Sequence, residues 1–108
     1  MIHEIATLPV HADGIAGFRE AFDAVAPLLA RAPGHAGHLL AQGIESPTVF
    51  TLIVRWQTLA DHRPGFEASA DHAVFMARLA PYLAAEPTVQ HVQGVASAWG
   101  GIDTQPTN

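Results

Sequence analysis

The segment 49–56, VFTLIVRW, has no polar face, and this constrains the fold more than any other part of the chain. In an extended strand, successive side chains point to opposite sides of the sheet. One face of this segment carries large apolar groups: Phe50, Leu52, Val54 and Trp56. The other face carries Thr51, Ile53 and Arg55. An antiparallel sheet with helices on one side usually shows a polar face to water on the other. The pattern therefore predicts a sheet buried on both faces, with a second copy of the same sheet as the cover.

The hydrophobic pattern predicts five further elements. Strands are expected at 2–8, 36–45 and 88–96, and helices at 14–32 and 70–84. Ser46-Pro47 predicts a turn that joins the second and third strands as an antiparallel hairpin, and Ser69 is expected to cap the second helix. The order β-α-β-β-α-β is that of an α+β, ferredoxin-like subunit, with an antiparallel sheet and both helices on one of its faces.

The chain of 108 residues is expected to form one domain over 1–96, followed by a tail at 97–108. Hydrophobic residues make up 49% of the chain and charged residues only 14%, which favours an oligomer. Trp99 and Ile102 raise the alternative that the tail packs on a partner subunit. No apolar run approaches the ~20 residues that span a bilayer, and the N-terminus lacks the features of a signal peptide. We therefore expect a cytoplasmic protein without membrane contacts.

Charge and cysteine content exclude several classes of function. The net charge is −5 and the five basic residues are all Arg, so a surface that binds nucleic acid is not expected. The absence of Cys removes disulfides, thiolate nucleophiles and Cys-ligated metals. His35 and His38 are close in sequence but have no carboxylate at ligand spacing, so no metal site is expected.

Four stretches resemble the antibiotic biosynthesis monooxygenase family when taken together and in order: APLLARAPGHAGHLL, GIESPTVFTLIVRW, HRPGFEAS and LAPYLAAEPTVQHV. The resemblance covers about residues 2–96. It implies a homodimer in which two sheets face each other in a dimeric α+β barrel, with one pocket per subunit between sheet and helices. Some members oxidise phenolic or quinol-type molecules with O2 and use no metal or flavin.

Other members of the family degrade haem, using an Asn on the first strand with a Trp and a His around the second helix. Here the first strand has no Asn, Phe66 stands at the position of the Trp, and Met76 lies nearest the position of the His. Haem degradation is therefore disfavoured, and no cofactor is expected.

Candidate site residues gather around the end of the third strand. His62, in the loop after Trp56, could be a mobile general base, and His72, in the first turn of a helix, could be a neutral one. The expected substrate-binding residues are Trp56, Phe66, Phe75, His38, Leu79 and His91. Each has a structural alternative. Trp56 can close the core, His62 and His72 can be solvated, and buried His38 and His91 can serve neighbouring hydrogen bonds. The helical spacing of Phe66, Phe75 and Leu79 leaves core packing and pocket lining equally open. For Arg55, an ion pair at the dimer interface is favoured.

Two hypotheses of different classes follow. The first is a cofactor-independent monooxygenase that acts with O2 on a small aromatic or quinol-type molecule. The second is a dimeric small-ligand-binding or stress-related protein of the same fold without oxygenase chemistry. An apolar pocket with a functional His favours the enzyme, whereas a pocket filled by Phe and Leu side chains favours the second hypothesis.

Overall fold

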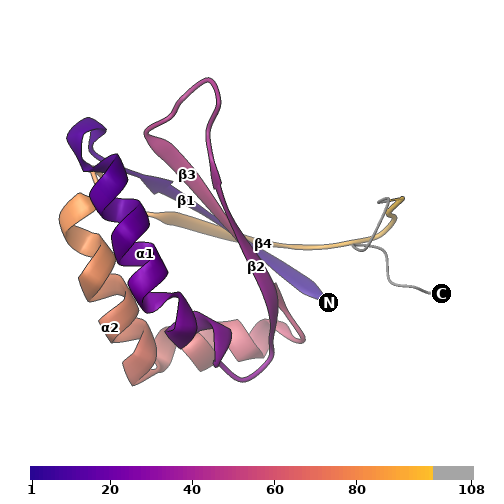
Figure 1. Ribbon diagram of the computed structural model, residues 1–108. Helices are drawn as coiled ribbons and strands as arrows, with labels where there is room; N and C mark the ends of the chain where they lie inside the picture. Colours follow the sequence, from indigo (N-terminus) through magenta and orange to yellow (C-terminus); the bar gives the residue numbers. More distant parts are fainter. Residues whose placement is uncertain (99–108) are drawn as a thin grey trace.

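The computed structural model describes residues 1–98 and contains one four-stranded sheet with two α-helices on one face (Figure 1). The elements are β1 (Ile2–Pro9), α1 (Ile15–Ala30), β2 (His35–Gln42), β3 (Val49–Trp56), α2 (Ala70–Leu79) and β4 (Thr88–Gln93). The strand order is β2-β3-β1-β4, and every neighbouring pair is antiparallel. The predicted ferredoxin-like α+β fold is therefore confirmed.

The hydrophobic core lies between the sheet and the two helices. The predicted face of β3 is buried, and the register places Ala6 opposite Leu52 and Leu8 opposite Phe50. Large side chains from both helices fill the space beneath it: Phe18, Phe22, Leu29, Phe75 and Leu79. Burying each such side chain contributes about 1.5–3 kcal/mol, so this layer holds the helices against the sheet.

Three predicted element ends differ from the structure by three residues or more. Helix α2 ends at Leu79 instead of residue 84, and Ala80–Tyr82 forms a 3-10 turn, because Pro81 has no amide hydrogen to continue the α-helix. Strand β2 ends at Gln42 instead of residue 45, where Gly43 N–H donates to Val49 O at 2.8 Å and starts the hairpin turn. Strand β4 ends at Gln93 instead of residue 96.

The connection from β3 to α2 positions the central part of the predicted site. It contains two short helical segments, η2 (Asp61–Gly65) and η3 (Phe66–Ala68). Thr58 and Asp61 start this connection by bonding each other's backbone N–H groups, both at 3.1 Å. Ser69 ends it as the predicted cap of α2, since its Oγ accepts from His72 N–H at 3.1 Å.

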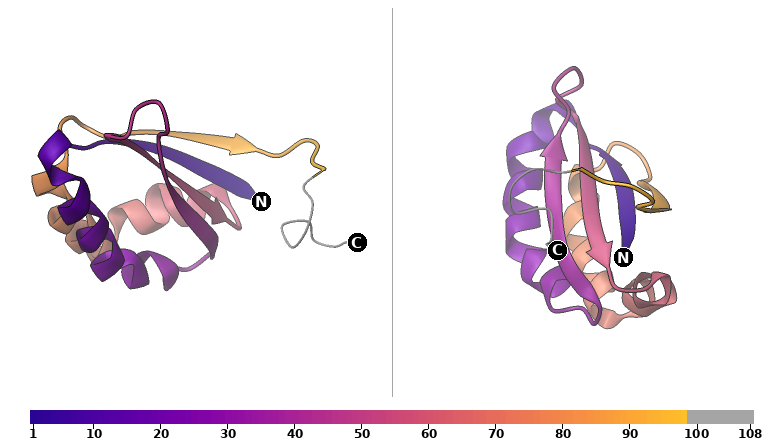
Figure 2. Two further views of the ribbon diagram at one scale, coloured as in Figure 1. Left: turned by 45° about the horizontal axis from the view of Figure 1, so that its top comes forward. Right: turned by 90° about the vertical axis from the view of Figure 1, so that its right-hand side faces the viewer.

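The other face of the sheet carries no helix in the described part of the chain (Figure 2). Its centre is apolar, because Ile5 and Leu39 lie on either side of Ile53 in the register. Leu39 is 59% exposed, and Val92, on the same face of β4, is 46% exposed. A second copy as the cover of this outer face remains a prediction, as does the role of the tail, since Trp99 and Ile102 lie outside the described residues. No helix within residues 1–98 is long and apolar enough to cross a membrane.

Candidate active site

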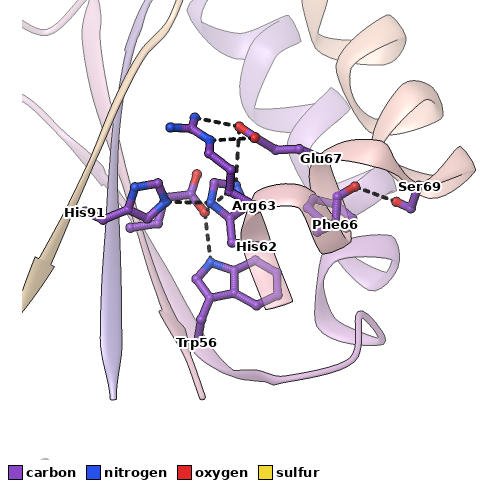
Figure 3. A network of polar contacts seen from close by, with 8 residues as sticks. Trp56, His62, Arg63, Phe66, Glu67, Ser69 and His91 are labelled. Carbon is purple, nitrogen blue, oxygen red and sulfur yellow. Dashed lines mark hydrogen bonds and ion pairs between the residues drawn. The ribbon is translucent and has the colours of Figure 1, made fainter. Parts of the chain in front are cut away.

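A buried polar cluster lies on the helix-facing side of the sheet, where β1, β3, β4 and η2 meet (Figure 3). Glu4 comes from β1, His91 lies opposite it on β4, Trp56 ends β3, and His62 is carried by η2. Glu4 is 6% exposed and His62 is 2% exposed, so both polar side chains are placed in the core. Such groups are retained at a cost unless they find polar partners.

The four side chains form a connected chain of polar contacts. Trp56 Nε1 donates to Glu4 Oε1 at 3.0 Å, and His62 Nε2 lies 3.3 Å from the same oxygen. His62 Nδ1 lies 2.8 Å from His91 Nε2. The contacts are satisfied when both rings are neutral and carry their proton on Nε2. His91 Nε2–H then donates to His62 Nδ1, and His62 Nε2–H points to Glu4. The contacts therefore form a directed path from His91 through His62 to the carboxylate.

Burial sets the protonation states of this path. Desolvation raises the pKa of Glu4 to about 6, although the hydrogen bond from Trp56 opposes the rise. Desolvation lowers the pKa of His62 to about 4, and the negative charge of Glu67 only partly offsets this effect. At neutral pH the site thus holds a buried carboxylate beside a neutral imidazole. That combination can accept one proton from outside.

A surface ion pair lies over the same cluster. Arg63 Nε and Nη2 donate to the two carboxylate oxygens of Glu67 at 2.8 and 2.9 Å. Glu67 Oε2 lies 3.8 Å from His62 Nε2 (Figure 3). The Arg63 side chain is half exposed and His91 is partly exposed, so these two residues form the solvent edge of the cluster.

Aromatic rings pack beside the polar cluster. The His62 ring stacks on Trp56 with centroids 5.2 Å apart, and Phe66 lies 5.8 Å from Trp56. Phe75 packs against Phe66 at 5.9 Å, and the edge of His72 meets Phe66 at 5.2 Å. The connection and α2 thus bring together most of the predicted site residues: Trp56, His62, Phe66, His72, Phe75 and His91.

The structure buries several of these residues in the core. His62 is not a mobile loop side chain, because its ring is buried and stacked on Trp56. Trp56, Phe75 and Leu79 are buried members of the hydrophobic core, which was the structural alternative to their expected role as substrate-binding residues. None of the three lines either of the two open hollows described next.

His38 lies apart from this cluster. It is on the edge strand β2, where its Nδ1 is 2.9 Å from His35 Nε2, and it lines an open hollow of about 450 Å³ beside α1. A second hollow, of about 360 Å³, lies between the end of α1 and the start of α2 and includes Phe66 in its lining. Between Met1 and Ala98, no group of three or more His, Asp and Glu side chains is arranged to hold a metal ion.

The sequence interpretation missed Glu4. Its position offered one signal, since Glu4, Ala6 and Leu8 alternate along the first strand and therefore share a face. An acidic residue on an otherwise apolar face is a candidate for a buried titratable group. Arg63 and Glu67 were also missed, although their i,i+4 spacing allows the observed pair.

Comparison with known proteins gives a consistent family assignment. Residues 1–78 match the family model described as antibiotic biosynthesis monooxygenase. The uncharacterized protein YczJ of Bacillus subtilis is 33% identical over 95 residues, which span 88% of this chain and all of YczJ. A Bordetella bronchiseptica protein named for the same family is 35% identical in its crystal structure, with a TM-score of 0.85 over 88% of this chain and 97% of that one.

A more distant structure shares the fold alone. A variant of SnoaB from Streptomyces nogalater, described as a cofactor-independent oxygenase, is 18% identical, with a TM-score of 0.76 over 89% of this chain and 94% of that chain. The family model and the two closer relatives carry the assignment. The chain belongs to the antibiotic biosynthesis monooxygenase family.

Proposed function

We propose that the protein is a cofactor-independent monooxygenase that oxidises a small aromatic or quinol-type molecule with O2. The observation that carries this proposal is the path of polar contacts from partly exposed His91 through His62 to buried Glu4. A substrate that is activated by losing a proton needs such an acceptor in a site of low polarity. Membership of the family and the fold shared with SnoaB support the same reaction class.

The path can move a proton from the substrate to Glu4 while both imidazole rings are neutral before and after the transfer. The substrate hydroxyl or acidic C–H gives its proton to His91 Nδ1, the ring nitrogen that the contact with His62 leaves unused. His91 passes its Nε2 proton to His62 Nδ1, and His62 passes its Nε2 proton to Glu4. The substrate becomes an anion and Glu4 becomes neutral.

The substrate anion then supplies the electrons itself. In an anthrone-like molecule, one electron passes to O2 and gives a substrate radical and superoxide, which combine to a peroxide anion. This anion recovers one proton through the path, and loss of water from the peroxide leaves a carbonyl group. One oxygen atom of O2 enters the product and the other leaves as water, so no external reductant is needed.

Oxygen uptake by metal-free protein tests this proposal. The substrates are a panel of quinols, anthrones and flavonoid-like phenols, and the variants are His62→Ala, Glu4→Gln and His72→Ala. General acid-base catalysis contributes about 10²–10⁴-fold, so His62→Ala and Glu4→Gln are each expected to slow uptake by at least about 100-fold. His11→Ala, at an exposed position, is the matched control and should retain the activity.

Two outcomes would contradict the proposal. Absence of uptake across the panel, with folded protein, would exclude oxygenase activity on this class of substrate. Loss of uptake in His72→Ala with retention in His62→Ala would place the base on α2 and remove the role of the path.

One observation favours a second function, a non-catalytic small-ligand-binding or stress-related protein. Trp56, Phe75 and Leu79 fill the space where a pocket was expected. Under this alternative, Glu4 and His62 serve only as hydrogen-bond partners for each other within the core. The alternative predicts no oxygen uptake together with a small molecule that copurifies and is detected by native mass spectrometry.

We further propose a cytoplasmic homodimer that forms through the outer face of the sheet. This face is apolar at its centre, and Arg55 Nε on it is buried without a hydrogen-bond partner among residues 1–98. A buried unpaired charged donor is costly, and an acceptor from a second copy would remove that cost.

A further inference from the structure

The outer face of the sheet carries a buried cationic donor but no acid. Arg55 Nε on this face is buried and has no hydrogen-bond partner among residues 1–98. The four strands together contain one carboxylate, Glu4, which bonds to Trp56 on the inner face. A buried guanidinium nitrogen without an acceptor costs free energy, so the assembled protein is expected to supply one.

A second copy of the same face supplies no carboxylate for this purpose. The register places His3 and Gly37 on either side of Arg55 and Val92 beyond His3. The next two rows of the face contain only Thr, Ile, Leu, Ala and Gln side chains. Two such faces packed together therefore contain two arginines and no acid. The compensating charge has to come from another part of the chain.

The chain has ten acids, and eight of those that remain after Glu4 is set aside lie in unsuitable places. Three belong to the segment 12–30, which forms η1 (Ala12–Gly14) and α1: Asp13, Glu20 and Asp23. Three already hydrogen-bond within the subunit: Asp61, Glu67 and Asp71. Two follow β2 or precede β4, at the end of the sheet opposite Arg55: Glu45 and Glu86. The remaining acid is Asp103, in the C-terminal segment 99–108.

The C-terminal segment starts from the end of the sheet at which Arg55 lies. Gln93, the last residue of β4, pairs with Ile2 at that end. Residues 94–98 then run on past the N-terminal end of β1 (Figure 1), and Val95 in this stretch is 95% exposed. The described start of the segment thus leads away from its own sheet, into space that a second copy can occupy.

We propose that the segment 99–108 of each subunit lies across its partner, where Asp103 pairs with the partner subunit's Arg55. Asp103 is ten residues beyond Gln93, so ~33 Å of extended chain is available to reach that side chain. Arg55 is in the last row of the face, so the segment meets it at the rim of the interface between the two sheets. Trp99 and Ile102 bring apolar surface to the same rim. The inference rests on the homodimer proposed above.

The dissociation constant of the full-length dimer, measured by sedimentation equilibrium, tests this contact. Asp103→Asn is expected to raise the constant at least about 100-fold, because a symmetric dimer loses two charge-assisted hydrogen bonds. Arg55→Gln should have a similar effect, and combining the two substitutions should add little, since both remove one interaction. Glu45→Gln and Glu86→Gln are the matched controls, because each neutralises an exposed acid, and both should leave the constant unchanged.

Mixing two charge-reversed chains distinguishes a contact between subunits from one within a subunit. Arg55→Asp leaves the first chain with two acids at the contact, and Asp103→Arg leaves the second chain with two cations. Each chain alone is expected to dimerise poorly. In a mixture, each C-terminal segment meets an opposite charge only on the other chain, so native mass spectrometry should show heterodimers. A contact within one subunit would leave both chains repulsive in the mixture as well.

Four outcomes would overturn the inference. An unchanged dissociation constant for Asp103→Asn would remove the contact and leave the homodimer standing, whereas a monomer for the unaltered protein would remove both. Failure of the mixture to form heterodimers would exclude a contact between subunits. A larger effect of Glu45→Gln than of Asp103→Asn would place the acceptor on the hairpin of a copy with reversed strands. Asp103 lies outside the elements that form the described core, so the decisive variant retains the fold.

Discussion

Glu4 is the residue at which burial and charge oppose each other most directly. A carboxylate in the core loses hydration, and the single hydrogen bond from Trp56 offsets only part of that cost. Its pKa of about 6 lies above the ordinary value of 4.5, so the folded protein holds the Glu4 proton more tightly than the unfolded chain. The stability associated with neutral Glu4 is present below about pH 4.5 and is lost as the pH rises through about 6.

Replacing Glu4 by Gln is expected to stabilise the protein at pH 8. One pKa unit corresponds to about 1.4 kcal/mol, so the rise from 4.5 to about 6 corresponds to a cost of up to about 2 kcal/mol for the ionised carboxylate. Gln keeps an oxygen that can accept from Trp56 and His62. Urea denaturation at pH 8 should therefore give a higher free energy of unfolding for Glu4→Gln, and Glu20→Gln, at an exposed position of α1, should change it little. A less stable Glu4→Gln variant would show that the charge stabilises the fold.

The pH dependence of oxygen uptake should follow the same group. Below about pH 6, Glu4 is protonated and cannot accept another proton, so kcat/KM is expected to fall about tenfold per pH unit. His62 remains neutral down to about pH 4 and does not limit the rate in this range. The negative charge of Glu67 contributes to the raised pKa of Glu4, so Glu67→Gln should move the midpoint to lower pH. A flat profile between pH 5 and 8 would exclude Glu4 as the acceptor.

The residues of this site differ in how well the sequence predicts them. Trp56, His62 and Phe66 are close in sequence, and their meeting at the end of β3 follows from local chain geometry. The contact of Glu4 with Trp56 depends instead on the register of β1 with β3, which joins residues far apart in the chain. The strand pattern alone leaves that register open.

At the scale of elements, the β3–α2 connection decides how the site is built. The sequence predicts β3 to the residue, because its alternation is strong and the Ser46-Pro47 turn fixes its start. For α2 only the start is predicted correctly, because Ser69 caps it. The apolar pattern continues past the observed end of the helix, where Pro81 interrupts the α-helical hydrogen bonds. The helical form of η2 and η3 is set by packing of Phe66 and His62 on Trp56. A short segment whose conformation depends on tertiary packing shows no periodic hydrophobic pattern in its sequence.

Removing the Ser69 side chain is expected to destabilise this connection. Ser69 Oγ accepts from His72 N–H and donates to Phe66 O at 2.6 Å, so one hydroxyl ties the start of α2 to η3. Loss of such a cap typically costs about 1 kcal/mol, and this is the expected decrease in the unfolding free energy of Ser69→Ala. Urea denaturation compares it with Ser46→Ala in the exposed hairpin turn. Equal stability of the two variants would show that the packing of Phe66 holds the connection without the cap.

At the scale of the whole molecule, the two faces of the sheet have unequal cover. The inner face is closed by α1 and α2, and the outer face presents Ile5, Ile53, Leu39 and Val92 without a covering element from residues 1–98. The low content of charged residues, 14%, gives the chain few groups to solvate that surface. The same features led the sequence interpretation to a dimer, which remains a prediction.

Placing a charge at the centre of the outer face should therefore separate the subunits. Ile53 lies between Ile5 and Leu39 in the register, so Ile53→Asp would bury an unpaired carboxylate in the proposed interface without entering the core. Sedimentation velocity is expected to show a dimer for the unchanged protein and a monomer for Ile53→Asp. Val74→Asp, which replaces an exposed apolar side chain on α2, is the matched control and should remain dimeric. A dimer that survives Ile53→Asp but dissociates in Val74→Asp would place the interface on the helices, and a monomer in every case would leave the outer face free for another partner.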